Sequence, residues 1–419
     1  MPRLGLGPKL IGNLKAKIAS EIAIKLIRVV TIALAARWLG SKAFGSYAYA
    51  LAIGYILVQF ADFGLQLHLA REIARSPKDA GPVFASVARA KILLSGCVVG
   101  AFIVIGLLQK SSAQDRLLLW ILGGGLLLAS FVEMANYVFR GFQKLDFEAR
   151  LNVLHIGSAS ALGLAAIRAG WGARGLAGGA LVAAVASAVI AAHWVHRHFI
   201  PWQQWILPRG RTGIMNALRP SAPIGVAILL AMLYFRVDVL FLERYQGKET
   251  VGLYAAAHKL LEAPMTLPAV FLSAIYPAFS ELTQVSRESL RRLCRTSIIW
   301  LLLLSAPLAC GLLWLAGPAV RLLYGAEYLR AVPTVQILSP ALIFIFLNYA
   351  LTHFLIGLGR QRYNAVLAGI CLVVNIVGNA LLVPRYGMAG AAGTRVLTEV
   401  TLFALAYPLV RHSLRRDLS

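Results

Sequence analysis

Long apolar runs recur along this chain of 419 residues, and they limit what it can fold into. Clear examples are IAIKLIRVVTIALAARWL, LLLWILGGGLLLASF and WLLLLSAPLACGLLWLAG. A helix of about 20 apolar residues is long enough to cross the hydrocarbon core of a bilayer. Only 14% of the residues are charged, whereas soluble domains average roughly 25%. We therefore expect an all-α integral membrane protein.

About twelve transmembrane helices can be placed along the chain. Their approximate bounds are 18–38, 43–63, 83–108, 117–139, 151–169, 174–195, 221–242, 251–276, 297–316, 333–356, 364–384 and 388–410. With the N-terminus in the cytoplasm, lysine and arginine concentrate in the cytoplasmic loops, as membrane proteins generally require. An even number of spans then leaves both termini cytoplasmic.

The net charge of +24 follows the same distribution. Basic residues at the cytoplasmic helix ends contact anionic phospholipids, so anionic phospholipids are expected partners. A nucleic-acid partner is not expected, because the chain has no basic, aromatic-rich soluble module. The four cysteines are scattered and have no paired spacing, and no metal motif or ATP-binding loop is present. We expect no cofactor and no metal.

Several motifs recur half a chain length apart. LGSKAFGSYAYA (39–50) matches QGKETVGLYAAA (246–257) in two glycines, a tyrosine and two alanines, 207 positions apart. GWGARGLAG matches YGMAGAAG at an offset of 215, and RGFQKLDF resembles IGLGRQRY at an offset of 216. Self-similarity at this period predicts two copies of one unit. Six helices per copy give both copies the same orientation, so the repeats are parallel.

This duplication predicts a domain division. Residues 1–200 form an N-terminal six-helix lobe, 201–220 a cytoplasmic linker, and 221–419 a C-terminal six-helix lobe. The predicted periplasmic loops are short, so no extramembrane domain is expected.

Charged residues inside the predicted spans are candidates for function, because an ionisable group in the bilayer core costs at least about 2.5 kcal/mol. Glu21, Lys25 and Arg28 share one helix face. They predict either a cationic stripe lining a cavity or an internal Glu21–Lys25 ion pair. The other candidates in the spans are Asp62, Glu133, Arg236, Asp238, Lys259, Glu262, Arg395 and Glu399.

Three parts of this set of charged residues also have a structural interpretation. Arg236 and Asp238 could hold the two halves together rather than contact a substrate. Pro264 and Pro268, which follow Glu262, indicate either a hinge or irregular packing. Arg395 and Glu399 are four residues apart, which favours a self-satisfied pair within one helix.

Three stretches carry a resemblance to a known family. ARWLGSKAFGSYAYALAIGYILVQFADFGLQLHLAREIAR (36–75) resembles the opening of the Wzx-type polysaccharide flippases. These belong to the multidrug/oligosaccharidyl-lipid/polysaccharide exporter superfamily. FRVDVLFLERYQGKETVGLYAAAHKLLEAP (235–264) is similar to the start of that family's second half. NIVGNALLVPRYGMAGAAGT (375–394) is similar to its eleventh-to-twelfth helix segment.

The resemblance implies a fold and a function. The fold is two six-helix lobes in a V around a central cavity that alternates its access. The substrate is a polyprenyl-pyrophosphate-linked oligosaccharide. It moves from the cytoplasmic to the periplasmic leaflet of the bacterial inner membrane during O-antigen, capsule or exopolysaccharide biosynthesis. A polysaccharide polymerase and chain-length machinery are the implied protein partners.

The resemblance also implies roles for the charged residues. Family cavities tend to be basic, which makes Lys25, Arg28, Arg236 and Lys259 the candidates for substrate binding. The candidates for gating or coupling are Glu21, Asp62, Glu133, Asp238, Glu262, Arg395 and Glu399. The acids in the spans balance the bases, however, and only the first helix shows a local cationic excess.

Other functions remain open at the level of sequence. A multidrug or cation antiporter of the same superfamily shares the architecture, but the Lys25 and Arg28 pair disfavours it. A lipid II flippase usually has fourteen helices. A membrane glycosyltransferase or polymerase usually needs a sizeable periplasmic loop, so an enzyme is not expected.

Overall fold

Helices make up nearly all of the structure. The computed structural model describes residues 8–109, 112–205 and 213–416, and within these ranges there is no strand. An apolar solvent offers no hydrogen bonds, so a spanning segment must satisfy its own backbone groups, and a helix does this locally. The expected all-helical architecture is confirmed.

The chain divides into two compact units. The first comprises Met1–Leu39 and Ala50–Leu229, and the second comprises Gly40–Tyr49 and Leu230–Ser419. Part of the expected linker, residues 206–212, lies outside the described residues.

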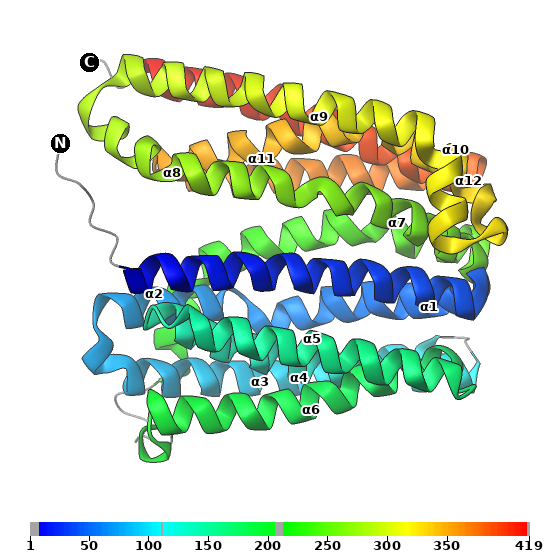
Figure 1. Ribbon diagram of the computed structural model, residues 1–419, viewed down its shortest axis with the longest axis horizontal. Coiled ribbons are helices and arrows are strands. Elements are labelled where there is room, and N and C mark those ends of the chain that lie inside the picture. The colour runs from blue at the N-terminus through cyan, green and yellow to red at the C-terminus, as the bar shows by residue number, and fades with distance from the viewer. Residues whose placement is uncertain (1–7, 110–111, 206–212, 417–419) are drawn as a thin grey trace. The chain divides into compact units, whose positions relative to one another are not determined.

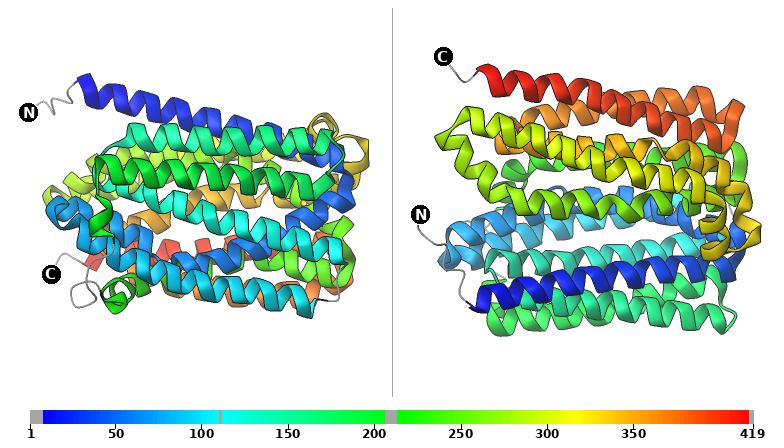
Figure 2. Two further views of the ribbon diagram at one scale, coloured as in Figure 1. Left: turned by 90° about the horizontal axis from the view of Figure 1, so that it is seen from below. Right: turned by 45° about the horizontal axis from the view of Figure 1, so that its top comes forward.

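The first unit is a bundle whose long helices run beside one another (Figures 1 and 2). Its elements are α1 (Pro8–Asp62, apart from 40–49), α2 (Leu65–Arg75), η1 (Pro77–Asp79), α3 (Ala80–Leu108), α4 (Ala113–Gly141), α5 (Leu145–Arg168), α6 (Gly172–His198), η2 (Trp202–Gln204) and the start of α7. Leu69 and Ile73 of α2 are buried in its core with Phe139 of α4 and Val195 of α6. This core lies toward the end of the bundle where α4 leads into α5.

The second unit contains the rest of the chain. Its elements are α7 (Ile214–Glu262) from residue 230, η3 (Ala263–Thr266), α8 (Leu267–Val285), α9 (Arg287–Tyr324), η4 (Ala326–Ala331), α10 (Val332–Leu338), α11 (Ala341–Gly357) and α12 (Gln361–Arg416). Helix α11 packs against both α9 and α12 (Figure 1). Pro264 lies in η3, so the backbone after Glu262 changes from α-helical to 3₁₀ geometry.

Three of the longest helices are interrupted by a glycine. Gly40 in α1 has φ 75° and ψ 166°, and Gly247 in α7 has φ 79° and ψ 178°. Gly387 interrupts α12 with φ 55° and ψ −128°. Only glycine adopts such conformations readily. Gly40 and Gly247 occupy matching positions in the repeated motif, so the repeated sequence encodes a repeated backbone break.

The same motif makes a close helix contact within the second unit. A Cβ atom on Gly45 would lie 1.7 Å from the carbonyl oxygen of Lys248, and one on Gly252 would lie 2.0 Å from that of Ser41. No side chain fits at either position. Gly45 and Gly252 correspond in the repeat, so the two copies of the motif cross through equivalent residues.

The described helices include seven that are long and apolar enough to cross a membrane, or up to nine if each of two bent pairs counts as one span. Large apolar side chains cover the outer surfaces of these helices, such as Leu303 at 59% and Trp300 at 58% exposed. A surface of this kind is suited to lipid. The chain is therefore a multi-pass membrane protein.

Candidate functional site

The cationic stripe expected near the start of the chain lies on α1 in the first unit. Glu21 and Lys25 are half-buried, and Arg28 is exposed. Among the described residues, no side chain forms a hydrogen bond or an ion pair with Lys25 or Arg28. The alternative, an internal Glu21–Lys25 ion pair, is thus not formed in the described part of the structure. Lys25 is nevertheless under the electrostatic influence of both Glu21 and Arg28.

A buried ion pair lies at the end of α1. Asp62 contacts the ammonium group of Lys91 on α3, whose side chain is fully buried. Gln66 in the first turn of α2 donates to Asp62 Oδ1 at 3.0 Å and to the carbonyl oxygen of Ser130 at 3.1 Å. The Lys91 ammonium also lies 5.1 Å from the ring centroid of Phe131. These contacts tie α1, α2, α3 and α4 together.

Sequence reasoning missed Lys91 because it was counted with the cytoplasmic loop charges. The signal was available, since Lys91 falls inside the predicted span 83–108. Its inclusion adds one base to the buried set.

A second polar cluster joins α4 to α5. Arg140 Nη2 lies 2.7 Å from Glu148 Oε1 and 3.2 Å from Glu133 Oε1. Asn136 donates to Glu133 at 2.8 Å and to Asn152 at 2.8 Å. Glu148 was not a sequence candidate, because it lies in the predicted loop between the spans 117–139 and 151–169, and its partner Arg140 is reached across the α4–α5 turn. The acids Glu133 and Glu148 share one guanidinium, so this cluster does not offer a free cation.

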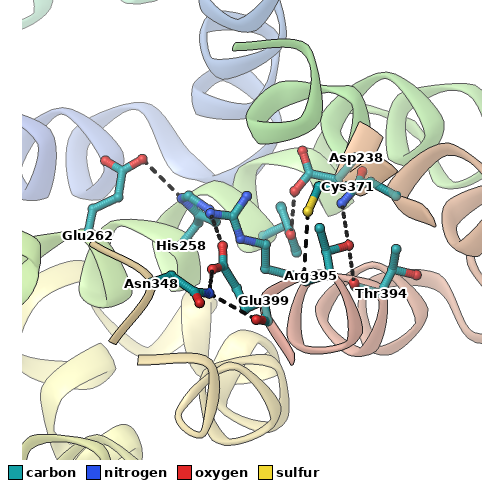
Figure 3. Close-up of polar contacts among 11 residues, drawn as sticks. Asp238, His258, Glu262, Asn348, Cys371, Thr394, Arg395 and Glu399 are labelled. Atoms are coloured by element: carbon teal, nitrogen blue, oxygen red, sulfur yellow. Dashed lines mark hydrogen bonds and ion pairs between the residues drawn. The ribbon is translucent and has the colours of Figure 1, made fainter. Parts of the chain in front are cut away.

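In the second unit, Glu262 is the centre of a cluster of basic groups, and Figure 3 shows its contact with His258. Its carboxylate lies 3.1 Å from His258 Nδ1, contacts the Lys259 ammonium, and lies 3.8 Å from Arg236 Nη2. Arg236 and Glu262 are on opposite sides of the break at Gly247. The break lets the two parts of α7 lie against each other, so residues 26 positions apart come into contact.

The same chain reversal pairs Asp238 with Tyr254. The Tyr254 hydroxyl donates to Asp238 Oδ2 at 2.6 Å, and both residues are buried. Asp238 Oδ1 also accepts from the Val239 amide at 2.8 Å. Asp238 therefore holds the two parts of α7 together within the second unit.

Arg395 and Glu399 lie on α12 and form the ion pair expected from their spacing. Arg395 Nη2 is 3.0 Å from Glu399 Oε1, and Arg395 is fully buried. Asn348 on α11 donates to Glu399 Oε2 at 2.9 Å, as Figure 3 shows. The Arg395 guanidinium also lies 4.1 Å from the ring centroid of Phe235. Asn348 is a partner that sequence reasoning did not find, since an amide costs less to bury than a charge and gives no comparable signal.

The structure thus separates the four expected substrate-binding cations into two kinds. Arg236 and Lys259 surround the carboxylate of Glu262. Lys25 and Arg28, in contrast, have no ion-pair partner among the described residues. Of the acids expected to gate or couple transport, Asp62, Glu133, Glu262 and Glu399 all contact a base within their own unit. The described residues contain no cluster of metal-ligating side chains.

Sequence comparisons agree with this architecture. A family profile described as polysaccharide biosynthesis protein matches residues 13–283, and the MatE profile matches residues 223–381. The putative O-antigen transporter of Shigella flexneri is 24% identical over 413 residues, which cover 91% of this chain and 94% of that protein.

Two further relatives match over shorter stretches. The capsular polysaccharide biosynthesis protein CapF of Staphylococcus aureus is 26% identical over 192 residues, covering 45% of this chain and 48% of CapF. An uncharacterized membrane protein of Methanocaldococcus jannaschii is 29% identical over 125 residues, covering 30% of this chain and 25% of that protein. The chain therefore matches about half of CapF and a quarter of the archaeal protein.

Solved structures share the fold. The lipid II flippase MurJ in an inward closed conformation has a TM-score of 0.77 and 15% identity, covering 94% of this chain and 87% of that one. An inward-facing multidrug resistance MATE family transporter of the MOP superfamily has a TM-score of 0.74 and 15% identity, covering 93% and 94%. At this identity the likeness concerns the fold alone.

Proposed function

Because the chain belongs to the polysaccharide biosynthesis protein family, we propose that it is a flippase for polyprenyl-pyrophosphate-linked oligosaccharide repeat units. It moves them from the cytoplasmic to the periplasmic leaflet by alternating access. The products serve the biosynthesis of O-antigen, capsule or exopolysaccharide. The family lies within the MOP superfamily of transporters, so the chain is a membrane transporter and not an enzyme.

The glycine breaks support a count of twelve spans. Dividing α1 at Gly40, α7 at Gly247 and α12 at Gly387 replaces three helices of 49 to 56 residues by six shorter ones. The part of α7 after Gly247 reaches spanning length together with η3 and α8. An unbroken helix of 55 residues would extend roughly 80 Å at 1.5 Å per residue, far more than the roughly 30 Å of a bilayer core. On this proposal each break is a turn between two spans.

Matching backbone conformations support two six-helix repeats. Gly172 and Gly387 have φ 59° and 55° at an offset of 215, and Gln143 and Gly359 have φ 58° and 72° at an offset of 216. We assign residues 1–200 to the N-terminal lobe, 201–220 to the linker and 221–419 to the C-terminal lobe. A V-shaped cavity between the lobes is part of the same proposal.

Lys25 and Arg28 are the proposed binding site for the substrate's pyrophosphate. The observation that carries this assignment is that neither has an ion-pair partner among the described residues. A guanidinium binds phosphate oxygens bidentately. Pairing with an anion also lowers the free energy of a cationic side chain that lies near apolar surroundings. The polyprenyl tail stays in the bilayer while the head group is carried across. Arg236 and Lys259 are secondary contacts that become available when Glu262 releases them.

The membrane is proposed to be the bacterial inner membrane, with both termini in the cytoplasm. A polysaccharide polymerase and chain-length machinery would act on the delivered repeat units. No cofactor is needed, because translocation changes no covalent bond.

A cation-coupled multidrug exporter is the second candidate. The MatE profile match over residues 223–381 favours it. So do the half-buried carboxylates Asp62 and Glu133, which could exchange protons or sodium ions during a transport cycle. The pair Lys25 and Arg28 disfavours it, since it would repel cationic drugs.

The decisive experiment uses a deletion strain complemented with the wild-type gene or with Arg28→Ala. We expect the deletion to accumulate lipid-linked repeat units in its membranes and to lose surface polysaccharide. Removal of one charge-assisted contact costs about 1.5–3 kcal/mol, so Arg28→Ala should lower export about tenfold or more.

Arg75→Ala is the matched control, because the Arg75 side chain is 74% exposed and forms an ion pair with Glu72, three residues away on the same helix. It should restore normal export. Wild-type export by Arg28→Ala at wild-type protein levels would reject the pyrophosphate site. An unchanged lipid pool in the deletion strain, together with increased drug sensitivity, would favour the exporter.

A further inference from the structure

A cavity of about 630 Å³ opens between the start of α9 and the end of α12 in the second unit. Both helix ends lie on the side that the charge distribution assigns to the cytoplasm. The size is within the range of sites that bind small ligands. Neither the proposed pyrophosphate site nor any charged cluster described above uses this cavity.

The charged residues of the lining are all basic in the described part of the chain. Arg291 and Arg295 come from α9 and Arg411 from α12, and no aspartate or glutamate is among the described residues that line the cavity. Arg291 Nη2 donates to the carbonyl oxygen of Leu414 at 3.2 Å. Arg295 and Arg411 form no ion pair with any described side chain. Three guanidinium groups around one cavity repel one another unless an anion lies between them.

The rest of the lining is mostly apolar and includes Tyr407. Ile298, Ile299 and Val410 line the cavity beside the arginines. Further along α9, Trp300 and Leu303 are 58% and 59% exposed. The surface thus changes from basic to apolar along the helix, in the direction from the cytoplasmic end toward the bilayer core. A ligand that fits this gradient has an anionic head and apolar chains.

In the first unit, the surface that corresponds to this cavity is covered by another segment of the chain. Ser76 and Ser286 precede the two copies of this helix and have similar backbone angles, with φ −142° and −153°. At their offset of 210, Arg291 corresponds to Gly81 and Cys294 to Phe84. Those two residues are covered by the chain itself.

The cover in the first unit is the segment that follows α6. A Cβ atom on Gly81 would lie 2.1 Å from Gln204 Oε1, and the rings of Phe84 and Trp205 have centroids 5.0 Å apart. An apolar surface there is thus sealed by aromatic packing. In the second unit, arginine replaces glycine at the matching position, which would oppose such packing and suits a charged occupant.

We propose that the α9–α12 cavity binds the phosphate head group of an anionic glycerophospholipid, with its acyl chains along the exposed face of α9. Arginine is suited to this role because its planar fork binds phosphate bidentately and is weakly hydrated. Basic pockets between helices on the cytoplasmic side are a known setting for such lipids. The site would anchor the second unit in the leaflet, and it stands whether or not the transport substrate is as proposed.

Native mass spectrometry of the full-length protein in detergent can test this site. The probes are phosphatidylglycerol, zwitterionic phosphatidylethanolamine, a polyprenyl phosphate and inorganic phosphate. We expect one phosphatidylglycerol to be retained. The variant Arg295→Gln/Arg411→Gln should bind it roughly 30-fold more weakly, from the contribution of each basic residue at an anionic surface.

Two further variants make the result specific. Arg292→Gln/Arg362→Gln removes the same charge from exposed positions outside the cavity lining, and it should change the affinity less than about twofold. Arg295→Lys/Arg411→Lys keeps the charge and should retain most of the binding, even if the glutamine variant does not fold.

Three outcomes would overturn the proposal. Equal binding of phosphatidylethanolamine would show that the charge is irrelevant. Saturable, tighter binding of the polyprenyl phosphate at this cavity would make it part of the substrate path. Displacement of the lipid by inorganic phosphate at millimolar concentration would assign the cavity to a free anion.

Discussion

Lys91 shows what it takes to bury a charge in this chain. Its side chain is fully buried on α3, and its ammonium contacts Asp62 and faces the Phe131 ring. Removing an ammonium from water costs several kcal/mol, and a nearby carboxylate recovers this cost only while the pair is intact. Gln66 on α2 also donates a hydrogen bond to the Asp62 carboxylate. Contacts from α2 and α3 therefore fix the position of this carboxylate.

We predict that Lys91→Met destabilises the protein by about 3–5 kcal/mol, because Asp62 is left without its counter-charge. The double variant Lys91→Met/Asp62→Asn should recover most of the loss. Thermal unfolding in detergent measures both. Lys78→Met is the control, since Lys78 is exposed in η1, and its midpoint should stay near that of the wild type. A double variant as unstable as the single one would mean that Lys91 acts through packing rather than through its charge.

Contacts between charged residues were predictable only where the chain is locally helical. The pair of Arg395 and Glu399 follows from a spacing of four residues on one helix. The contact between Arg236 and Glu262 does not, because the two residues lie on different predicted spans, 221–242 and 251–276, and one sequence does not show which faces of two spans meet. Glu148 was likewise hidden, since its partner Arg140 lies on the other side of a turn. A single sequence gives the cost of burying a charge but not the partner that offsets it.

At the scale of helices, the apolar runs predicted nearly every element, because spanning length and helical hydrogen bonding leave few alternatives. The repeat also pointed to Gly40 and Gly247 before their geometry was known. The sequence did not reveal the backbone conformation through which these glycines interrupt the helices. Their φ values of 75° and 79° interrupt a helix without any proline. The crossing at Gly45 and Gly252 depends on backbone contact, for which one sequence carries no direct signal.

Gly247→Ala tests the backbone break alone. No heavy atom lies within 4 Å of a Cβ placed on Gly247, so the substitution adds no clash with a neighbour. Its φ of 79° and ψ of 178° lie in a region that is essentially restricted to glycine. We expect a loss of about 1–3 kcal/mol in stability, seen as a lower unfolding temperature in detergent.

Gly393→Ala is the matched control for this break. It too has open space around its Cβ position, but it lies within a helical part of α12 without a positive φ. Alanine is favoured over glycine in a helix by up to about 1 kcal/mol, so this variant should be neutral or slightly stabilised. If both variants lost stability equally, the conformation of Gly247 would not explain the effect.

At the scale of the whole molecule, the number of spans decides which side of the membrane each loop faces. Seven of the described helices are long and apolar enough to cross a membrane, or nine if each bent pair counts as one span. An odd number of spans would place the two termini on opposite sides of the membrane. The proposed count of twelve spans, with turns at Gly40, Gly247 and Gly387, would place them on the same side. With that count, the excess of lysine and arginine in alternate loops predicts that this side is the cytoplasm.

Reporter fusions distinguish these cases. We predict that green fluorescent protein fused at the C-terminus is fluorescent and that alkaline phosphatase there is inactive, because only the cytoplasm allows the first and prevents the second. Alkaline phosphatase fused after Gly170, between α5 and α6, should be active, since five spans precede it. Fused after Gln143, between α4 and α5, it should be inactive. An active C-terminal phosphatase would mean an odd number of spans. At least one glycine break would then be a bend within a span, and the six-helix repeats would have to be redrawn.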